Sequence, residues 1–81
     1  MNVRVRLFAV ARQLVGSEAA ELELPAKPTV ADLRAALITR YPQLGNVNRH
    51  LIFAVNAEYA GDETWIPEDA ELACIPPVSG G

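Results

Sequence analysis

Hydrophobic and polar residues alternate at two places near the start of the chain. Every second position from residue 3 to residue 7 is apolar, with arginines between, which is the two-residue period of a strand with one buried face. The same period returns at 20–24, where glutamates separate the apolar residues, and it ends at Pro25. Residues 9–15 suit a short helix that Gly16 ends. Because the connection is short, we expect the two strands to pair as an antiparallel, hairpin-like unit.

The longest helical pattern begins after Thr29. Apolar residues recur at three- and four-residue steps from Val30 to Tyr41, so one stripe of this helix is apolar. Thr29 is a good N-cap, and Asp32 supplies an aspartate version of the capping box. Pro42 ends the pattern. The sequence therefore predicts one amphipathic helix that packs its apolar stripe against a sheet.

The second half of the chain predicts further strands separated by turns. Residues 43–49 are polar and include glycine and asparagine, so we expect a loop. Residues 51–56 are apolar at both parities, which predicts a central strand covered on both faces. We expect a turn or short return strand at 57–59, a second turn at 61–63, and a final strand at 71–75.

This order of elements predicts an α+β fold. Two strands, a crossover helix and further strands are the order of the β-grasp fold, so we expect a mixed sheet of four or five strands crossed by one main helix. The 81 residues leave room for a single core. We expect a β-grasp domain at residues 1–75 and an extended C-terminal tail at residues 76–81.

The composition argues against several classes of protein. The net charge is −3 and the seven basic residues are scattered, which disfavours a nucleic-acid partner. No apolar run approaches the length of a membrane span, and the alternating N-terminus does not resemble a signal peptide. The single cysteine, Cys74, cannot form an intrachain disulfide, and one cysteine with one histidine is too few for a zinc site. We expect a cytoplasmic protein with no membrane and no metal partner.

Candidate catalytic groups are few. A thiol–imidazole pair of Cys74 and His50 is conceivable, but Cys74 shares parity with Leu72 and is expected to be a small buried hydrophobe. Glu21 and Glu23 lie on the polar parity of a strand, where solvated charge belongs. The sequence has no glycine-rich phosphate loop and no hydrolase or zinc-protease motif. The chain therefore shows no catalytic apparatus of its own, and whether it acts as part of an enzyme stays open.

Parity also predicts exposed apolar side chains. Ile75 shares a face of the last strand with Glu71, so we expect that face to be wet and Ile75 to be exposed. Phe8 shares parity with the arginines of the first strand, and Tyr59 lies in a turn. A contiguous apolar patch of this kind would be a docking surface. The alternative is that the short helix after Phe8 covers these residues, and the sequence leaves both interpretations open.

The C-terminal residues carry the most specific functional signal. They are Pro76, Pro77, Val78, Ser79, Gly80 and Gly81. The prolines are stiff and cannot continue a sheet ladder, so they direct the chain away from the domain. The glycines add no bulk beside the last carboxylate, and six extended residues reach roughly 20 Å, enough to enter a partner's active site. The alternative is an inert, frayed end.

These residues resemble the C-terminus of a known family. Residues 75–81 are similar to the end of the small, ubiquitin-like sulfur-carrier subunit of molybdopterin synthase. Further matches lie at 5–9, 11–16, 29–34 and 54–56, so the resemblance covers essentially the whole chain. One departure is Asp69-Ala70 in the turn before the last strand, where the family usually has Gly-Asp. Aspartate tolerates left-handed geometry, so the departure affects the local turn and not the fold.

The resemblance implies a cycle of activation and transfer. A partner adenylating enzyme would use ATP to convert the Gly81 carboxylate to an acyl-adenylate, and a sulfur donor protein would then make it a thiocarboxylate. The tail at residues 76–80 would enter a channel in the large subunit of the synthase. There the sulfur would pass to cyclic pyranopterin monophosphate, during molybdenum cofactor biosynthesis.

The resemblance also implies where partners bind. By family position Phe8, Tyr59 and Ile75 would belong to the surface that binds the large subunit, in a hetero-oligomer. The catalytic groups would belong to the larger partner, and this chain would bind no cofactor. Three alternatives stay open: a sulfur carrier for thiamine, cysteine or tRNA thiolation, a protein modifier joined to a target lysine, and a small binding module with an inert tail. Deleting Gly80 and Gly81 would separate the binding module from the others.

Overall fold

The computed structural model of the chain describes residues 1–76. The predicted roles of Pro77, Val78, Ser79, Gly80 and Gly81 lie outside the described residues. In chain order the elements are β1 (Asn2–Leu7), α1 (Ala9–Val15), β2 (Ala19–Glu23), α2 (Val30–Arg40), the 3-10 helix η1 (Pro42–His50), β3 (Ile52–Val55), β4 (Glu58–Ala60) and β5 (Leu72–Ile75).

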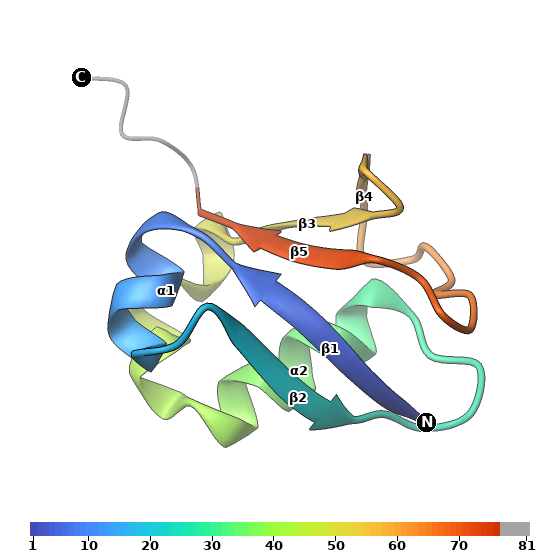
Figure 1. Ribbon diagram of the computed structural model, residues 1–81, viewed down its shortest axis with the longest axis horizontal. Coiled ribbons are helices and arrows are strands. Elements are labelled where there is room, and N and C mark those ends of the chain that lie inside the picture. Colours follow the sequence, from blue (N-terminus) through green and yellow to red (C-terminus); the bar gives the residue numbers. More distant parts are fainter. Residues whose placement is uncertain (77–81) are drawn as a thin grey trace.

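Five strands form one mixed sheet in the order β2-β1-β5-β3-β4. β1 pairs with β2 as the predicted antiparallel hairpin and with β5 in parallel, while β3 pairs antiparallel with both β5 and β4. In Figure 1 helix α2 lies behind the β1–β2 hairpin, on one side of the sheet. The predicted α+β, β-grasp fold is confirmed.

Helix α2 begins at the predicted N-cap. The Thr29 hydroxyl accepts a hydrogen bond from the Asp32 backbone N–H at 3.4 Å, and the Thr29 N–H donates to Asp32 Oδ2 at 2.9 Å. This reciprocal capping box satisfies two N–H groups that helix geometry leaves free. Val30, Leu33 and Leu37 are buried. The predicted apolar stripe therefore forms the helical part of the core.

An aromatic ring and an arginine join the two layers. Phe53 of β3 is fully buried, and the guanidinium of Arg34 lies 4.9 Å from the centroid of its ring. Arg34 Nη1 donates to the Asn48 carbonyl oxygen at 2.7 Å, and Arg34 Nε donates to Asp62 Oδ1 at 3.2 Å. One side chain therefore ties α2 to η1 and to the turn after β4.

The expected loop at 43–49 is wrong. This segment belongs to η1, which begins with Pro42, and proline suits the first turn of a helix because its missing N–H has no partner there. Leu44 is fully buried, and its N–H donates to the Tyr41 carbonyl oxygen at 2.9 Å. A 3-10 segment lacks the 3.6-residue period of an α-helix. Without that period, only the polar composition of the segment could be interpreted, and it is typical of a loop. His50 is the last residue of this helix.

The expected central strand at 51–56 is confirmed in part: β3 lies inside the sheet, although not at its middle. β3 lies next to the edge strand β4, and β5 occupies the centre of the sheet. Phe53 and Val55 are buried on one parity and Ala54 on the other, and only Ile52, at the start of the strand, is 41% exposed. The apolar residues at both parities therefore belong to a strand that is buried on both parities except at this end.

Two turns place ordinary residues in left-handed conformations. Asn56 and Ala57, with φ of 52° and 69°, form the two-residue loop between β3 and β4, and the flanking Val55 and Glu58 pair. Positive φ at both positions is the requirement of a type I′ hairpin turn, so the predicted turn and short return strand are confirmed. Asp69 has a φ of 61° before β5, which agrees with the tolerance expected of aspartate there.

Candidate functional site

The outer face of the sheet carries two rows of residues across neighbouring strands. One row runs from β1 to β4 through Arg6, Ala73, Ala54 and Tyr59. In the next row Ile75 of β5 pairs with Ile52 of β3. Because Leu7 pairs with Cys74, Phe8 lies beside Ile75. We call the apolar members of these rows that reach the surface the docking face: Phe8, Ile52, Tyr59, Ala73 and Ile75; Ala54, between them, is buried.

The docking face is open to solvent. Tyr59 is 77% exposed, Ile52 41% and Phe8 38%, and Ile75 is half-buried. Helix α1 begins directly after Phe8 and leaves more than a third of this side chain uncovered. Exposed apolar side chains that occur singly are common, but contiguous ones on adjacent strands mark interaction surfaces. The geometry therefore suits a partner that covers this side of the sheet.

The chain leaves the sheet beside the docking face. β5 ends at Ile75, and Pro76, the last described residue, is buried. The Phe8 N–H donates to the Cys74 carbonyl oxygen at 3.2 Å, which holds this strand end beside β1. The Arg6 guanidinium lies 5.4 Å from the centroid of the Phe8 ring, on the same side of the sheet. The end of β5 is thus held next to an apolar surface.

The three residues predicted to bind a partner all lie on this face. Strand pairing brings Phe8 and Ile75 together, and Tyr59 lies in the adjacent row. Sequence reasoning missed Ile52, because parity does not reveal the order of the strands or which face the helices cover. One signal could have identified Ile52: it alternates with Phe53 along the strand, so the two side chains point to opposite faces of the sheet. The binding role of these residues stays a prediction.

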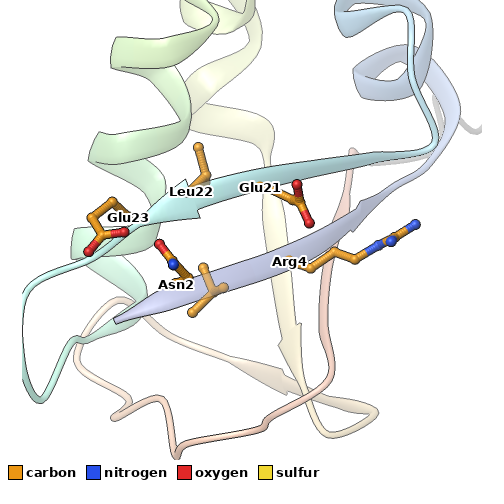
Figure 2. Close-up of a pocket in the computed structure, with 6 residues that line it drawn as sticks. Asn2, Arg4, Glu21, Leu22 and Glu23 are labelled. Carbon is orange, nitrogen blue, oxygen red and sulfur yellow. The ribbon is translucent and has the colours of Figure 1, made fainter.

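The other end of the outer face is charged. Figure 2 shows Asn2 and Arg4 of β1 beside Glu21 and Glu23 of β2. These residues line a shallow hollow of about 480 Å³. The register pairs Asn2 with Glu23 and Arg4 with Glu21. Leu22 points away toward α2, and it is buried. Glu21 and Glu23 are exposed, as predicted for solvated charge, so the apolar docking face ends at a polar surface.

Cys74 has the environment of a core residue. It is fully buried, and burial raises the pKa of its thiol to about 12, although the charge of Arg34 acts in the opposite direction. Such a thiol is protonated at neutral pH and lacks the nucleophilic thiolate form. His50 is exposed at the end of η1. The prediction that Cys74 is a small buried hydrophobe is confirmed.

Across residues 1–76, no three His, Cys, Asp or Glu side chains are grouped so that they could hold a metal ion. None of the helices described over the same range is long and apolar enough to cross a membrane. What this part of the chain does provide is an apolar surface beside the strand end from which the chain continues.

Comparison with known proteins identifies the family of this chain. The model of the ThiS family matches residues 5–81. The chain belongs to the ThiS family. A molybdopterin synthase sulfur carrier subunit of Caenorhabditis briggsae is 37% identical over 83 residues, covering 100% of this chain and 99% of the relative. The subunit of the same name in Arabidopsis thaliana is 36% identical over 81 residues, covering 100% and 84%. This ThiS-family chain is thus homologous over its full length to molybdopterin synthase sulfur carrier subunits.

Solved structures share the fold of this ThiS-family chain. SAMP1 from Haloferax volcanii, a small archaeal modifier protein, superposes with a TM-score of 0.86 at 29% identity, with 100% of both chains covered. A chain in the complex of subunits 1 and 2 of the Helicobacter pylori molybdopterin-converting factor superposes with a TM-score of 0.67, again with 100% of both chains covered. Its identity is 22%, so this second likeness concerns the fold. Both agree with the β-grasp topology described above.

Proposed function

We propose that this chain carries sulfur as a thiocarboxylate on Gly81 and delivers it within molybdopterin synthase. The observation that supports this most is the position of the docking face beside the end of β5, from which the sequence continues to Gly80 and Gly81. Homology over the full length of the chain supports the same role. In this proposal the large subunit covers the docking face and receives the tail.

The proposed cycle converts a poor acyl donor into a sulfur nucleophile. An adenylating enzyme joins the Gly81 carboxylate to AMP from ATP and releases pyrophosphate, because a free carboxylate resists substitution. A persulfide on a sulfur donor protein then displaces AMP. A second thiol cleaves the sulfur–sulfur bond, which leaves the thiocarboxylate and a disulfide. The thiocarboxylate adds sulfur to cyclic pyranopterin monophosphate in two rounds of delivery.

The composition of the tail suits this cycle. Pro76 and Pro77 restrict the backbone, so less conformational freedom is lost when the tail enters a channel. Gly80 and Gly81 leave room for the groups of two successive partners around the same carbonyl. In this proposal ATP is a substrate of the activating enzyme.

The direct test is mass spectrometry of a C-terminal fragment after incubation with an adenylating enzyme, ATP and a sulfur donor. One oxygen is expected to be replaced by sulfur in the fragment that follows Glu71. The fragment is measured because oxidation of Met1 changes the intact mass by almost the same amount. An unchanged fragment, with an adenylating enzyme that is active on another carrier, would contradict the proposal.

A matched pair of tail variants tests the role of the last residue. Gly81→Ala is expected to reduce sulfur loading at least tenfold without lowering the melting temperature, because the added methyl group lies beside the activated carbonyl and outside the core. Ser79→Ala changes the same tail two residues earlier and is expected to load normally. Full loading of Gly81→Ala would argue against a tightly enclosed carbonyl.

A second candidate function is protein modification. The similarity to SAMP1 favours it, because that relative is a small archaeal modifier protein. In this case the activated Gly81 is joined to a lysine amine instead of accepting sulfur. Sulfur delivery for thiamine, cysteine or tRNA thiolation would use the same thiocarboxylate, so an assay of the acceptor separates these pathways from the pterin pathway.

A further inference from the structure

The docking face does not account for every exposed aromatic residue. Trp65 is 62% exposed and lies in the loop after β4, where it forms a bridge with Thr29, the N-cap of α2. The Ile66 N–H donates to the Pro28 carbonyl oxygen at 2.9 Å, so this loop lies beside the loop that follows β2. The two loops border a groove of about 460 Å³ next to Met1.

The groove combines an apolar wall with an amine. Its wall includes the exposed Trp65 and Pro67 and the buried Ile66. Lys27, the sole lysine of the sequence, is exposed and lines the same groove. Its φ of 52° lies in the left-handed region, which is unfavourable for lysine and is maintained in the turn before Pro28.

The other amine near this groove is engaged. The amino group of Met1 is part-buried, donates to the Leu24 carbonyl oxygen at 2.8 Å and lies 3.6 Å from Glu23 Oε1. The remaining six basic side chains are arginines, which stay protonated and are not acyl acceptors. Among residues 1–76, Lys27 is therefore the exposed amine available to an acyl donor.

We propose that this groove receives the C-terminal tail of a second copy of the chain, and that Lys27 is the amine acylated by its activated Gly81. The inference rests on the activation step of the proposed function. The neutral amine nitrogen of Lys27 attacks the Gly81 carbonyl carbon and forms the C–N bond. The bond from that carbon to the adenylate oxygen breaks, AMP leaves with the electron pair, and the proton of the amine passes to solvent. The product is an isopeptide bond between two copies.

The chemistry of the tail suits the groove. Proline-rich segments adopt the extended polyproline conformation and dock in grooves lined by aromatic residues. Trp65 and Pro67 offer such a surface to Pro77 and Val78 of the incoming tail. The site therefore offers an aromatic and proline-containing surface to the tail beside Lys27.

The chain's own tail leaves the sheet far from Lys27. β1 and β5 are parallel and in register at Leu7 and Cys74, so Pro76 lies about seven residues further along the sheet than Asn2, roughly 23 Å away. Residues 77–81 span at most about 18 Å. Figure 1 places the N-terminus, beside the groove, at the opposite end of the sheet from the end of β5. Within one copy the bond would require a fully extended tail, whereas the tail of a second copy has no such constraint.

The test uses the full chain with a C-terminal thioester, made by cleavage of an intein fusion. This supplies an activated carbonyl without any activating enzyme, and a thiol then leaves in place of AMP. At mildly alkaline pH a covalent dimer is expected on denaturing gels. Digestion with glutamyl endopeptidase is expected to give residues 72–81 attached to Lys27. Absence of the dimer, or attachment at Met1, would overturn the proposal.

Variants separate a seated tail from unselective acylation. Lys27→Arg keeps the charge but removes the nucleophile, so no dimer is expected. Adding Arg49→Lys to that variant restores the number of amines at an exposed position outside the groove. This double variant is expected to remain monomeric, and dimer formation by it at the wild-type rate would overturn the role of the groove. Trp65→Ala, with Lys27 present, is expected to slow dimer formation at least fivefold.

Sulfur loading separates this inference from the proposed function. Lys27→Arg is expected to acquire sulfur on Gly81 at the wild-type level, because position 27 is remote from the strand end at Pro76. A thioester chain that forms the Lys27 linkage while the enzyme-treated chain acquires no sulfur would retain this inference and contradict the sulfur-carrier role. Normal sulfur loading without any dimer from the thioester would retain the sulfur-carrier role and contradict the acylation of Lys27.

Discussion

Ile75 pairs with Ile52 across β5 and β3, in the row of the sheet next to the point where the chain leaves the domain. Ile52 is 41% exposed and Ile75 is half-buried, so two branched aliphatic side chains lie side by side at the surface. Full burial of one such side chain stabilises a complex by about 1.5–3 kcal/mol. The pair is therefore well placed to anchor a partner that receives the tail.

Ile52→Glu is expected to weaken association with the large subunit of molybdopterin synthase at least tenfold. The substitution replaces an apolar contact by a carboxylate that must lose its hydration in the interface, and a tenfold change is about 1.4 kcal/mol. Titration calorimetry measures the dissociation constant. The melting temperature is expected to change little, because the side chain is already partly in water.

Thr39→Glu is the matched control for this variant. It adds the same negative charge at an exposed position of α2, on the helical side of the sheet. Its affinity for the large subunit is expected to match the wild type. Equal weakening by the two substitutions would show that net charge controls association, and it would contradict binding of the large subunit through the docking face.

Periodicity in the sequence predicts most of this fold because local rules decide it. The capping box of Thr29 and Asp32 and the strand alternation around Val5 depend on neighbouring residues, and both are present in the structure. The 3-10 helix around Leu44 was missed because it lacks a 3.6-residue period. Patterns that depend on residues close in sequence were therefore the reliable ones.

The candidate site was only half predictable, because a face of a sheet depends on long-range pairing. Parity identified Phe8 and Ile75 as outward-facing, but it could not show that β5 would lie between β1 and β3. That order brings Ile52, which is 41% exposed, next to Ile75. The short connection between β1 and β2 indicated that these two strands are neighbours, but no comparable signal gave the place of β5 between β1 and β3.

Ala57→Gly is expected to raise the free energy of unfolding by about 1 kcal/mol. Ala57 has a φ of 69° in the two-residue loop between β3 and β4, and the left-handed region costs a residue with a Cβ atom about this much. Asn56, the other residue of the loop, is well suited to this conformation. Urea denaturation monitored through Trp65 fluorescence measures the difference.

Gly16→Ala makes the opposite change, because it places a Cβ atom on a residue with a positive φ. Gly16 ends α1 with a φ of 81°, and no atom lies within 4 Å of the position that a Cβ would take. Any loss of stability in this variant therefore reports the backbone conformation and not a steric clash. A loss of about 1 kcal/mol is expected. If both substitutions left stability unchanged, left-handed strain would not explain either turn.

Arg34→Lys is expected to destabilise the fold by about 1–2 kcal/mol although the charge is kept. The planar guanidinium contacts the Asn48 carbonyl oxygen and the Asp62 carboxylate at once while it lies over the Phe53 ring. A lysine ammonium cannot reproduce that fork or its stacking. Arg40→Lys, at an exposed position near the end of the same helix, is the control and should be within about 0.5 kcal/mol of the wild type.

The stabilisation provided by Cys74 is expected to depend on pH. Burial raises the pKa of the folded thiol to about 12, against a value near 9.0 for a thiol in water. A raised folded-state pKa means that the stabilisation is complete below the unfolded pKa and is lost as the pH rises from about 9 toward 12. The folded state holds the proton in this window while the unfolded state releases it.

Comparison with Cys74→Ala isolates this effect, because all other titrating groups are common to both proteins. At neutral pH the variant is expected to be about 1–2 kcal/mol less stable, since it loses packing in the core. At roughly pH 10 the difference should shrink by about 1.4 kcal/mol, the equivalent of one pKa unit. Urea titrations at both pH values measure it, and a difference that does not change with pH would mean that the folded thiol ionises as readily as the unfolded one.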